Sequence, residues 1–404
     1  MRDISCIQCH ECALQIDVPS LEVAQKAICP RCGFLLKASR KNALERVFVF
    51  AFSALVFLTM SLFFEFLSFT RNGLENSFTL LDSLMILMQK NYHLLALIEM
   101  ITVFLIPCTI LVVLMYLSFY LLKGHYPPQG WRLLRVVFVL LPWSMVEIFL
   151  IGALVSIIKI LSMADISLGL SFYCFTLFSL FMTIVVLHLD KHQFIQLLAN
   201  THSTQAATEQ ALEQLVPEEH EVIHNKYSIQ STWALLITAI VVYIPANTLP
   251  IMTTRLLGQD EPSTILGGVI VLWEMGSFPI AIIIFIASIV IPIGKIIILA
   301  WLNYTVQKPQ YGLTIARIKS YRIAEFIGRW SMIDVFVVIV LVSMIQLGDT
   351  MSIFPGEAII AFCGVVVLTM LAAMSFDSTL IWSAPQPTIT TDENKDDSDH
   401  SRRS

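Results

Sequence analysis

Four cysteines near the N-terminus have the spacing of a metal site. Cys6 and Cys9 are separated by two residues, as are Cys29 and Cys32, and nineteen residues lie between the two pairs. Four thiolates at this spacing suit tetrahedral Zn2+ in a closed structural site. The sequence therefore predicts one structural zinc ion with these four cysteines as its ligands.

The same segment offers other ligands and other chemistry. His10 and Cys12 follow the first pair directly, and either could substitute for one of its cysteines. A redox-active pair or a degenerate knuckle is the other interpretation of a Cys-x2-Cys spacing. The remaining cysteines lie in apolar runs, where a thiol packs as a small hydrophobic side chain; they are Cys108, Cys174 and Cys363.

A second group of chemically capable side chains lies inside apolar runs. Lys295 and Asp334 occupy consecutive antiparallel runs at similar depth, so the long lysine side chain can reach the carboxylate. Ser288 shares the helix face of Lys295, Ser331 shares that of Asp334, and Thr369 can face the same interior. Charges inside lipid are costly and usually functional. We predict a protonatable centre on a transport path; an ion pair that only orients two helices is the alternative.

The first half of the chain repeats part of this pattern. A Trp-Ser-Met-x-acid-x-Phe sequence begins at Trp143 and again at Trp330, and Glu147 in the first copy matches Asp334 in the second. Ile110 stands where the second half has its lysine, so Glu147 lacks that partner. Because Glu147 matches Asp334, we assign it to the polar cluster. Because it lacks the lysine, we predict that the second half is the more specialised one.

Two prolines bracket a polar residue near the external end of the fifth apolar run. Asn247 lies between Pro245 and Pro250. Proline removes a backbone hydrogen bond and leaves carbonyl groups free. We predict a mouth for a substrate or partner at these three residues; an ordinary kink that ends the run is the alternative.

One short pattern matches the zinc metalloprotease signature. His220, Glu221 and His224 fit H-E-x-x-H, in which both histidines bind zinc and the glutamate acts as base. The pattern follows Pro217 in a polar linker and has no evident third ligand. A membrane-bound zinc metallopeptidase is therefore a distant alternative, and a solvated linker is favoured.

The elements that position these residues are apolar helices. Hydrophobic residues make up 56% of the chain and charged residues 14%, whereas about one quarter of a soluble domain is charged. Eight apolar runs approach the roughly 20 residues that a helix needs to cross a bilayer. They cover residues 46–68, 92–122, 136–160, 170–189, 231–252, 279–302, 330–347 and 356–376. The sequence predicts an all-α polytopic membrane protein.

The eight runs form two similar halves. Pro107 matches Pro292, and Gly169 matches Gly356. Each half holds four runs, an even number, so the two insert in the same orientation, unlike inverted repeats. The predicted order is a cytoplasmic zinc ribbon (1–40), a four-span module (41–190), a cytoplasmic linker without cysteine (191–230), a second four-span module (231–376) and a disordered cytoplasmic tail (377–404).

Basic residues distinguish the two sides of the membrane. Lysine and arginine are concentrated in the N-terminal segment and in the loops after the second and sixth runs. Basic loops stay in the cytoplasm, so both termini are predicted to be cytoplasmic, where disulfides are disfavoured. The net charge of -5 and the lack of a basic surface argue against nucleic acid. No Walker motif or glycine-rich phosphate loop is present, so ATP binding is not expected.

These features together resemble the paraquat-inducible protein A (PqiA/LetA) family of Gram-negative inner-membrane proteins. The resemblance rests on the Cys-x2-Cys head, two sets of four spans and the Pro-Ala-Asn-x2-Pro sequence at Pro245–Pro250, and it covers roughly residues 1–380. It implies that the Lys295 and Asp334 group answers to the family's buried Lys/Asp/Ser/Thr cluster. Family modules each begin with a zinc ribbon, but the linker here lacks cysteine, so a second zinc is not expected.

The resemblance also implies partners and a function. The family is associated with periplasmic MCE-domain proteins, which build lipid tunnels between the inner and outer membranes. The predicted function is to load or extract phospholipid or a similar lipid for such a tunnel, without enzymatic activity. The proton gradient acting through Asp334 and Lys295 is the economical driving force. A non-transporting anchor or gate for the tunnel protein is the alternative.

Overall fold

The computed structural model consists mainly of helices. It describes residues 5–9, 11–18, 25–38, 42–71, 74–161, 165–190, 193–195, 197–198, 221–256, 259–274, 276, 278–307, 314–330, 332–344 and 351–382. In these residues, seven helices are long and apolar enough to cross a membrane: Ala43–Phe63, His93–Leu122, Gly130–Ile158, Leu170–His188, Tyr227–Thr248, Ala281–Val306 and Ala358–Ser375. They agree with seven of the eight predicted runs.

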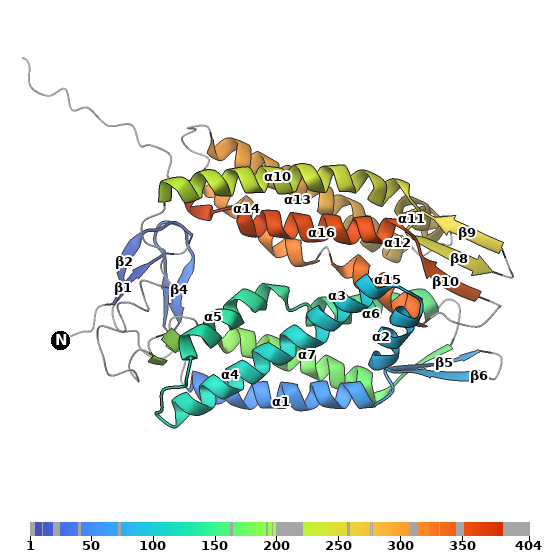
Figure 1. The fold of residues 1–404 in the computed structure, drawn as a ribbon, viewed down its shortest axis with the longest axis horizontal. Coiled ribbons are helices and arrows are strands. Elements are labelled where there is room, and N and C mark those ends of the chain that lie inside the picture. Colours follow the sequence, from blue (N-terminus) through green and yellow to red (C-terminus); the bar gives the residue numbers. More distant parts are fainter. Residues whose placement is uncertain are drawn as a thin grey trace, which may run out of the picture.

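The helices form two groups that lie side by side (Figure 1). The first half of the chain contributes α1 (Ala43–Phe63), α2 (Leu80–Gln89), α3 (His93–Glu99), η1 (Met100–Leu105), α4 (Ile106–Leu122), α5 (Gly130–Leu140), η2 (Leu141–Trp143), α6 (Val146–Leu161) and α7 (Leu170–His188). The second half contributes α10 (Glu221–Thr248), α11 (Ile265–Glu274), α12 (Phe278–Phe285), η3 (Ile286–Val290), α13 (Ile291–Val306), α14 (Thr314–Trp330), α15 (Ile333–Met344), α16 (Ala358–Ser375) and η4 (Ser378–Ile381).

Apolar side chains cover the outside of these groups as well as the inside. On α1, Val49, Phe52 and Val56 are exposed at helical spacing, and on α10 Ile237 and Val241 are exposed in the same way. An exposed apolar stripe on a long helix is the surface that lipid tails cover. The helices therefore have the outward faces of membrane spans.

The seventh predicted run is described only in part, because residue 331 and residues 345–350 lie outside the described residues. Within residues 330–347, the described helix is α15, which has 12 residues. At a rise of about 1.5 Å per residue it reaches about 18 Å, short of the roughly 30 Å of a hydrocarbon core. Its described side chains are buried throughout, because α15 packs against α2, α3 and α6 of the first half as well as against α16. The element is an internal helix between the two groups.

In each half, the second long helix contains a π-helical turn at the equivalent position. The π-helical turns η1 and η3 end where α4 and α13 begin, and each is followed by an Ile-Pro pair. The backbone N–H of Ile106 donates to the carbonyl of Ile101, and that of Ile291 donates to Ile286. Proline at the next position has no N–H to continue the regular pattern, which accounts for the shared irregularity. Such turns are common at functional sites.

The described residues include four small β-sheets, which make the prediction of an all-α fold incomplete. β5 (Leu67–Arg71) lies between β6 (Leu74–Phe78) and β7 (Asp165–Leu168). In the second half, β8 (Met252–Leu256) lies between β9 (Gln259–Ser263) and β10 (Met351–Pro355) in the same arrangement. All these strands are four or five residues long and lie in connections between helices. Figure 1 shows both sheets at one end of the molecule.

A glycine closes each of these sheets against the helices. The N–H of Gly169 donates to the carbonyl of Phe66 at 3.0 Å, and the N–H of Gly356 donates to that of Ile251 at 2.8 Å. A Cβ atom on either glycine would collide with a neighbouring carbonyl oxygen, that of Glu65 or of Pro250. The predicted match of Gly169 with Gly356 is therefore confirmed in three dimensions.

Helices α6 and α15, which carry the two copies of the repeated Trp-Ser-Met-x-acid-x-Phe sequence, pack against each other between the halves. Phe149 on α6 and Phe336 on α15, which are equivalent in the repeat, meet edge to face with ring centroids 5.6 Å apart. Gly152 allows this approach, because a Cβ atom there would lie 3.0 Å from the Cβ atom of Phe336. The hydroxyl of Ser156 donates to the carbonyl of Val337 at 3.2 Å. The two copies of the motif thus pack against each other.

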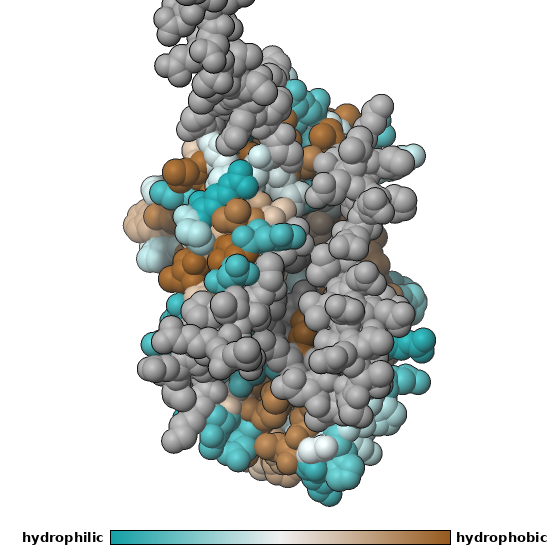
Figure 2. Space-filling view, turned by 90° about the vertical axis from the view of Figure 1, so that its left-hand side faces the viewer, coloured by the Kyte–Doolittle hydropathy of each residue, from teal (hydrophilic) through white to brown (hydrophobic). Residues whose placement is uncertain are grey.

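The N-terminal head lies at the end opposite the three-stranded sheets (Figure 1). It consists of two antiparallel hairpins, β1 (Ser5–Gln8) with β2 (Gln15–Val18) and β3 (Lys26–Ile28) with β4 (Leu35–Ala38). Seen from this end, hydrophilic side chains are interspersed among hydrophobic ones (Figure 2). That mixture is the pattern of a surface in contact with water.

Two predicted boundaries also differ. Helix α10 begins at Glu221, so it includes the last ten residues of the predicted linker, 221–230. The predicted tail starts with an ordered turn, because the side chain of Asp377 accepts a hydrogen bond from the Thr379 N–H at 2.9 Å and so caps η4. Linker residues 199–220 and tail residues 383–404 lie outside the described residues.

Candidate functional site

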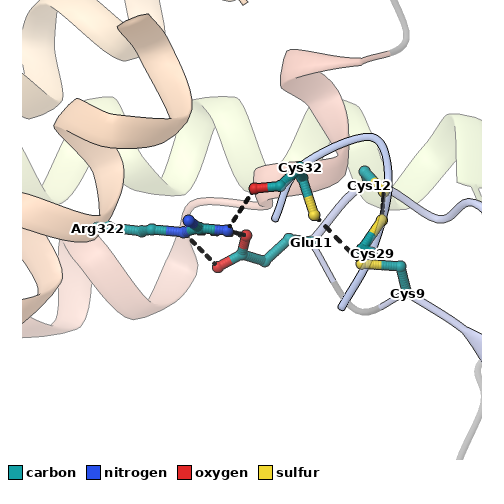
Figure 3. Close-up of polar contacts among 6 residues, drawn as sticks. All are labelled: Cys9, Glu11, Cys12, Cys29, Cys32 and Arg322. Carbon is teal, nitrogen blue, oxygen red and sulfur yellow. Dashed lines mark hydrogen bonds and ion pairs between the residues drawn. The ribbon is translucent and has the colours of Figure 1, made fainter. Parts of the chain in front are cut away.

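The head brings four thiols together. The sulfur atoms of Cys9, Cys12, Cys29 and Cys32 all lie within 4.8 Å of one another, and the Cys9–Cys32 and Cys12–Cys29 pairs are each 3.5 Å apart (Figure 3). In a tetrahedron with Zn–S bonds of about 2.3 Å the sulfurs are about 3.8 Å apart. The four thiols therefore fit a single zinc ion, and their softness favours it over hard cations.

Two equivalent turns create this geometry. In the second turn the N–H of Cys29 donates to the carbonyl of Phe34 at 2.8 Å, and the N–H of Gly33 donates back to Cys29 at 2.9 Å. The first turn repeats both bonds around Cys9, at 2.9 and 2.8 Å. The residue after the second cysteine is left-handed in both turns, with φ of 53° at Ala13 and 71° at Gly33. Each turn starts immediately after a strand, so both pairs of thiols point to one centre.

The predicted ligand Cys6 is replaced by Cys12. The alternative that Cys12 could substitute for a predicted ligand is the arrangement observed, whereas His10 lies outside the described residues. Cys6 belongs to β1, where its backbone pairs with Asp17, and its side chain is not among those described. It stands three residues before the turn, whereas Cys9 occupies the first position after the strand, as Cys29 does. Alanine in place of glycine at the left-handed position concealed the first turn.

The protein environment prepares the thiols unequally. Burial raises the pKa of the Cys12 thiol to about 11 and also raises that of Cys32. Burial acts in the same direction on Cys29, but hydrogen bonds from the backbone of Cys32 and Arg31 outweigh it and lower the pKa of Cys29 to about 7. A thiolate is the form that binds metal. The backbone of the second turn therefore supplies the most readily formed thiolate.

An arginine from the second half holds the head in place. Arg322 on α14 bonds both carboxylate oxygens of Glu11 through Nε, at 3.1 and 3.2 Å, and bonds Glu11 again through Nη2. The same Nη2 donates to the carbonyl of Cys32 at 2.9 Å (Figure 3). Glu11 lies between Cys9 and Cys12, and its side chain is only 8% exposed. One guanidinium group therefore contacts both cysteine turns.

The end of the described chain supports the same contact. The guanidinium carbon of Arg31 lies 4.5 Å from the ring centroid of Trp382, and Trp382 packs against the apolar residues around the thiols. The head adjoins the first half in sequence but contacts α14 and the residues after α16 of the second half. Sequence reasoning missed Glu11, Arg322 and Trp382, since no local pattern links positions 311 residues apart.

A second polar site lies within the helices of the second half. Lys295 on α13 is only 1% exposed, and its Nζ donates to the hydroxyl of Thr369 on α16 at 2.8 Å and to the carbonyl of Gly328 on α14 at 3.5 Å. Ser288 on η3 is buried seven residues before Lys295. The expectation that Thr369 faces the lysine is therefore met. Three helices meet at one buried ammonium group.

Only the backbone of the aspartate predicted beside this lysine is described. The backbone of Asp334 lies in the first turn of α15, and α15 contacts η3, which precedes α13. The side chain of Asp334, and all of Ser331, lie outside the described residues. The contact between Lys295 and Asp334 therefore stays a prediction.

Glu147 makes a described contact within the first half. Its carboxylate on α6 accepts a hydrogen bond from the hydroxyl of Thr183 on α7 at 2.9 Å, and it is half-buried. The side chain of Asp334, on the neighbouring helix α15, lies outside the described residues. The inclusion of Glu147 in the polar cluster therefore stays a prediction.

The predicted external mouth is part of a helix end. Pro245 lies inside α10, which continues to Thr248, and the amide nitrogen of Asn247 donates to the carbonyl of Tyr243 at 3.0 Å. The carbonyl of Pro250 accepts a hydrogen bond from the N–H of Ala358 at 3.3 Å. All three predicted residues are half-buried. These contacts give Asn247 and Pro250 structural roles, and a role as a mouth stays a prediction.

Comparison with known proteins places the chain in a family. The family model described as paraquat-inducible protein A matches it twice, over residues 44–198 and 229–386. The intermembrane transport protein PqiA of Escherichia coli (strain K12) is 35% identical over 399 residues, which cover 93% of this chain and 95% of that protein. The chain belongs to the paraquat-inducible protein A family. The two matched segments contain the two groups of helices seen in Figure 1.

Further relatives carry names of the same kind. A probable intermembrane transport protein of Haemophilus influenzae is 29% identical over 405 residues, covering 93% of this chain and 95% of that protein. Lipophilic envelope-spanning tunnel protein A of Escherichia coli (strain K12) is 27% identical over 403 residues, with coverage of 93% and 91%. No solved structure matches the chain. Family membership and the seven apolar helices together identify a multi-pass membrane protein of a transport family.

The metallopeptidase pattern gains no support from the family. Glu221 and His224 lie in the first turns of α10, but their side chains, and all of His220, lie outside the described residues. Among the described residues, the only group of histidine, cysteine and acidic side chains able to hold a metal is the four-cysteine cluster. The relatives are named as transport proteins and not as peptidases.

Proposed function

We propose that this protein is the inner-membrane component of an MCE-type lipid transport system. In this role it loads or extracts phospholipid, or a similar lipid, that a periplasmic MCE-domain protein carries between the inner and outer membranes. The names of its relatives, which refer to intermembrane transport and to an envelope-spanning tunnel, support a role of this class. The proposal extends that class to a substrate and a partner.

The observation that carries the proposal is the buried Lys295 contact. Lys295 is 1% exposed and bonds Thr369 on a neighbouring helix, α16, whose buried side chains are mostly apolar. An ammonium group at that depth is costly, and it is usually retained where substrate or protons pass. With Asp334 as its predicted partner, Lys295 forms a polar centre that can bind a lipid headgroup or exchange a proton.

The proposed topology has two modules of four spans and both termini in the cytoplasm. The head and the three-stranded sheets lie at opposite ends of the molecule (Figure 1), so a cytoplasmic head leaves the sheets on the periplasmic side, where the MCE partner would dock. In this arrangement α14 and α15 together form the seventh of the eight spans. Residues Pro245, Asn247 and Pro250 adjoin β8 at the sheet end and would lie near the partner.

The proposed cofactor is one structural zinc ion in the head. Cys9, Cys12, Cys29 and Cys32 would hold it, and zinc would supply folding free energy to two hairpins that have a small apolar core. Arg322 would then hold the metal-bound head against α14. The same helix provides the Gly328 carbonyl beside Lys295.

Reconstitution tests the proposal directly. The purified chain is placed in liposomes with fluorescent phospholipid, and lipid transfer is measured with and without an MCE-domain partner and a pH gradient. Thr369→Val removes the hydroxyl bonded to Lys295 at nearly constant volume, and Thr238→Val changes a lipid-exposed threonine of α10 as the matched control. We expect partner-dependent transfer that falls at least tenfold in the first variant only. Docking of the partner without any lipid transfer would favour the anchor or gate.

A further inference from the structure

A buried carboxyl group lies where the two halves meet. Glu99, the last residue of α3, is 0% exposed, although it belongs to an apolar helix long enough to span a membrane. The hydroxyl of Ser83 on α2 lies 3.0 Å from each of its carboxylate oxygens. That hydroxyl also lies 3.1 Å from the hydroxyl of Ser343 on α15, which comes 260 residues later in the chain. The first half thus has a polar site of its own.

The number of hydrogen-bond donors around Glu99 bears on its protonation state. The hydroxyl of Ser343 donates to the carbonyl of Ile339 at 2.8 Å, and each hydroxyl has one proton to give. If Ser83 donates to Ser343, the oxygens of Glu99 receive no hydrogen bond. If Ser83 donates to Glu99 instead and accepts from Ser343, two buried oxygens and a full charge share one donor, and Ser343 gives up its bond to Ile339. A neutral carboxyl group removes the buried charge and keeps every bond, because it donates to Ser83, Ser83 donates to Ser343, and Ser343 donates to Ile339.

The charged groups on neighbouring elements do not bond Glu99 in the described part of the chain. The titratable residues on the helices packed around it are Asp82, Lys90, His93, Glu147, Lys159 and Asp334. The Asp82 carboxylate bonds Thr79 in the capping box of α2, the Glu147 carboxylate bonds Thr183, and Lys90 and His93 are exposed. The side chains of Lys159 and Asp334 lie outside the described residues. The described surroundings supply hydroxyl groups, which favour a neutral acid over a buried charge.

We propose that Glu99 is a proton-binding site inside the membrane, at which a neutral carboxyl group donates to Ser83 and through it joins the first half of the protein to α15. The ligand is a proton. The site is separate from the Lys295 contact and does not depend on lipid as the transported substrate. The second half has Ile284 at the position equivalent to Glu99, counted from the shared Ile-Pro pair, so each half carries one polar site that the other lacks.

Binding of a proton at Glu99 affects α15, because Ser83 links the two. Helix α15 carries Asp334 nine residues before Ser343, or about 13 Å along the helix axis. The first half bonds α15 at two places, through Ser83 to Ser343 and through Ser156 to the carbonyl of Val337. Loss of the proton from Glu99 would reverse the donors at the first of these places: Ser343 would donate to Ser83, Ser83 would donate to Glu99, and Ser343 would no longer bond the carbonyl of Ile339. The helix that carries Asp334 would thereby sense the protonation of Glu99.

Infrared spectroscopy of the full-length protein in liposomes at neutral pH tests the proposal. A protonated carboxyl group has a carbonyl stretch distinct from that of a carboxylate, and the band shifts when the protein is transferred to D2O. We expect this band in the wild type and its loss, by one carboxyl group per chain, in Glu99→Gln. Glu65→Gln is the matched control, since Glu65 is an exposed glutamate of the same half, and it should leave the band unchanged.

A second variant covers the case in which Glu99→Gln does not fold. Ser83→Ala leaves the carboxyl group in place but removes the oxygen that accepts its hydrogen bond. The band should therefore persist and move to the frequency of a carboxyl group with a weaker hydrogen bond. Identical carboxyl spectra in the wild type and Glu99→Gln would overturn the proposal. A wild type without any protonated carboxyl band at neutral pH would overturn it as well, whatever the behaviour of the variants.

Discussion

At the scale of single residues, the four-cysteine cluster depends on where a strand ends. Cys6, Cys9 and Cys12 are equally spaced, and a rule based only on Cys-x2-Cys can select either pair. The turn decides between them, because only the cysteines at the first and fourth positions after a strand face the centre. Cys9 and Cys12 occupy those positions after β1, as Cys29 and Cys32 do after β3.

This choice predicts opposite results for two cysteine variants. Cys12→Ser should reduce bound zinc from about one per chain to none and unfold the head, because structural zinc contributes folding free energy directly. Cys6→Ser should keep the zinc, since that residue lies inside the strand. Elemental analysis of protein purified without chelator measures both. Loss of zinc in Cys6→Ser with retention in Cys12→Ser would restore the original ligand set.

At the scale of elements, two glycines fix the junction of sheet and helix in each half. Gly169→Ala and Gly356→Ala should each destabilise the protein by about 1–3 kcal/mol or more, because the added methyl group collides with a backbone oxygen that cannot move away. Gly268→Ala, on α11 with open space around it, should be neutral. Thermal unfolding in detergent measures all three. Equal melting temperatures for the three variants would show that the junction is not tight.

The contact between head and α14 makes a separate prediction. Arg322→Ala removes the guanidinium group that bonds Glu11 and Cys32. It should weaken docking of the head by about 1–2 kcal/mol; solvent screening keeps this free energy small, because the Arg322 side chain is 36% exposed. Amide hydrogen exchange in β1–β4 should rise several-fold while zinc stays bound. Lys319→Ala, an exposed change on the same helix, is the control. Unchanged exchange in Arg322→Ala would mean that other contacts hold the head.

Much of this architecture can be predicted from sequence, for physical reasons that differ by element. Helices such as α1 and α16 were found because lipid requires about 20 apolar residues in a row. β5 and β8 were missed because each has only five residues between helices, too few to show the alternation of apolar and polar residues that predicts a strand. The burial of α15 between the two halves was not predicted, because an internal helix is as apolar as one in lipid. Arg322 was missed because its partner is remote in the chain.

At the scale of the whole molecule, the two halves share a fold but differ in chemistry. The same sheet, π turn and glycine junction occur in each. The polar groups do not repeat: Glu99 with Ser83 lies in the first half, and Lys295 with Thr369 lies in the second. The packed copies of the Trp-Ser-Met motif, together with α15, connect the two sites. The two halves therefore carry chemically different buried groups, a carboxyl group in the first and an amine in the second, in the same scaffold.

The central claim is that the Lys295 and Asp334 site moves lipid rather than only joining helices. Removing one partner of a buried pair leaves an uncompensated charge, which typically costs about 3–5 kcal/mol, whereas replacing both with apolar residues is often tolerated. The double variant Lys295→Met with Asp334→Leu therefore separates folding from function. Its folding and membrane insertion should match the wild type, with far-UV circular dichroism and bound zinc as controls.

The most direct measurement is the rate of phospholipid transfer by this double variant in liposomes with the MCE-domain partner present. We predict a folded protein that docks the partner and transfers lipid at no more than a few per cent of the wild-type rate. Transfer at the wild-type rate by the folded double variant would contradict the claim and leave Lys295 and Asp334 as a clamp between helices.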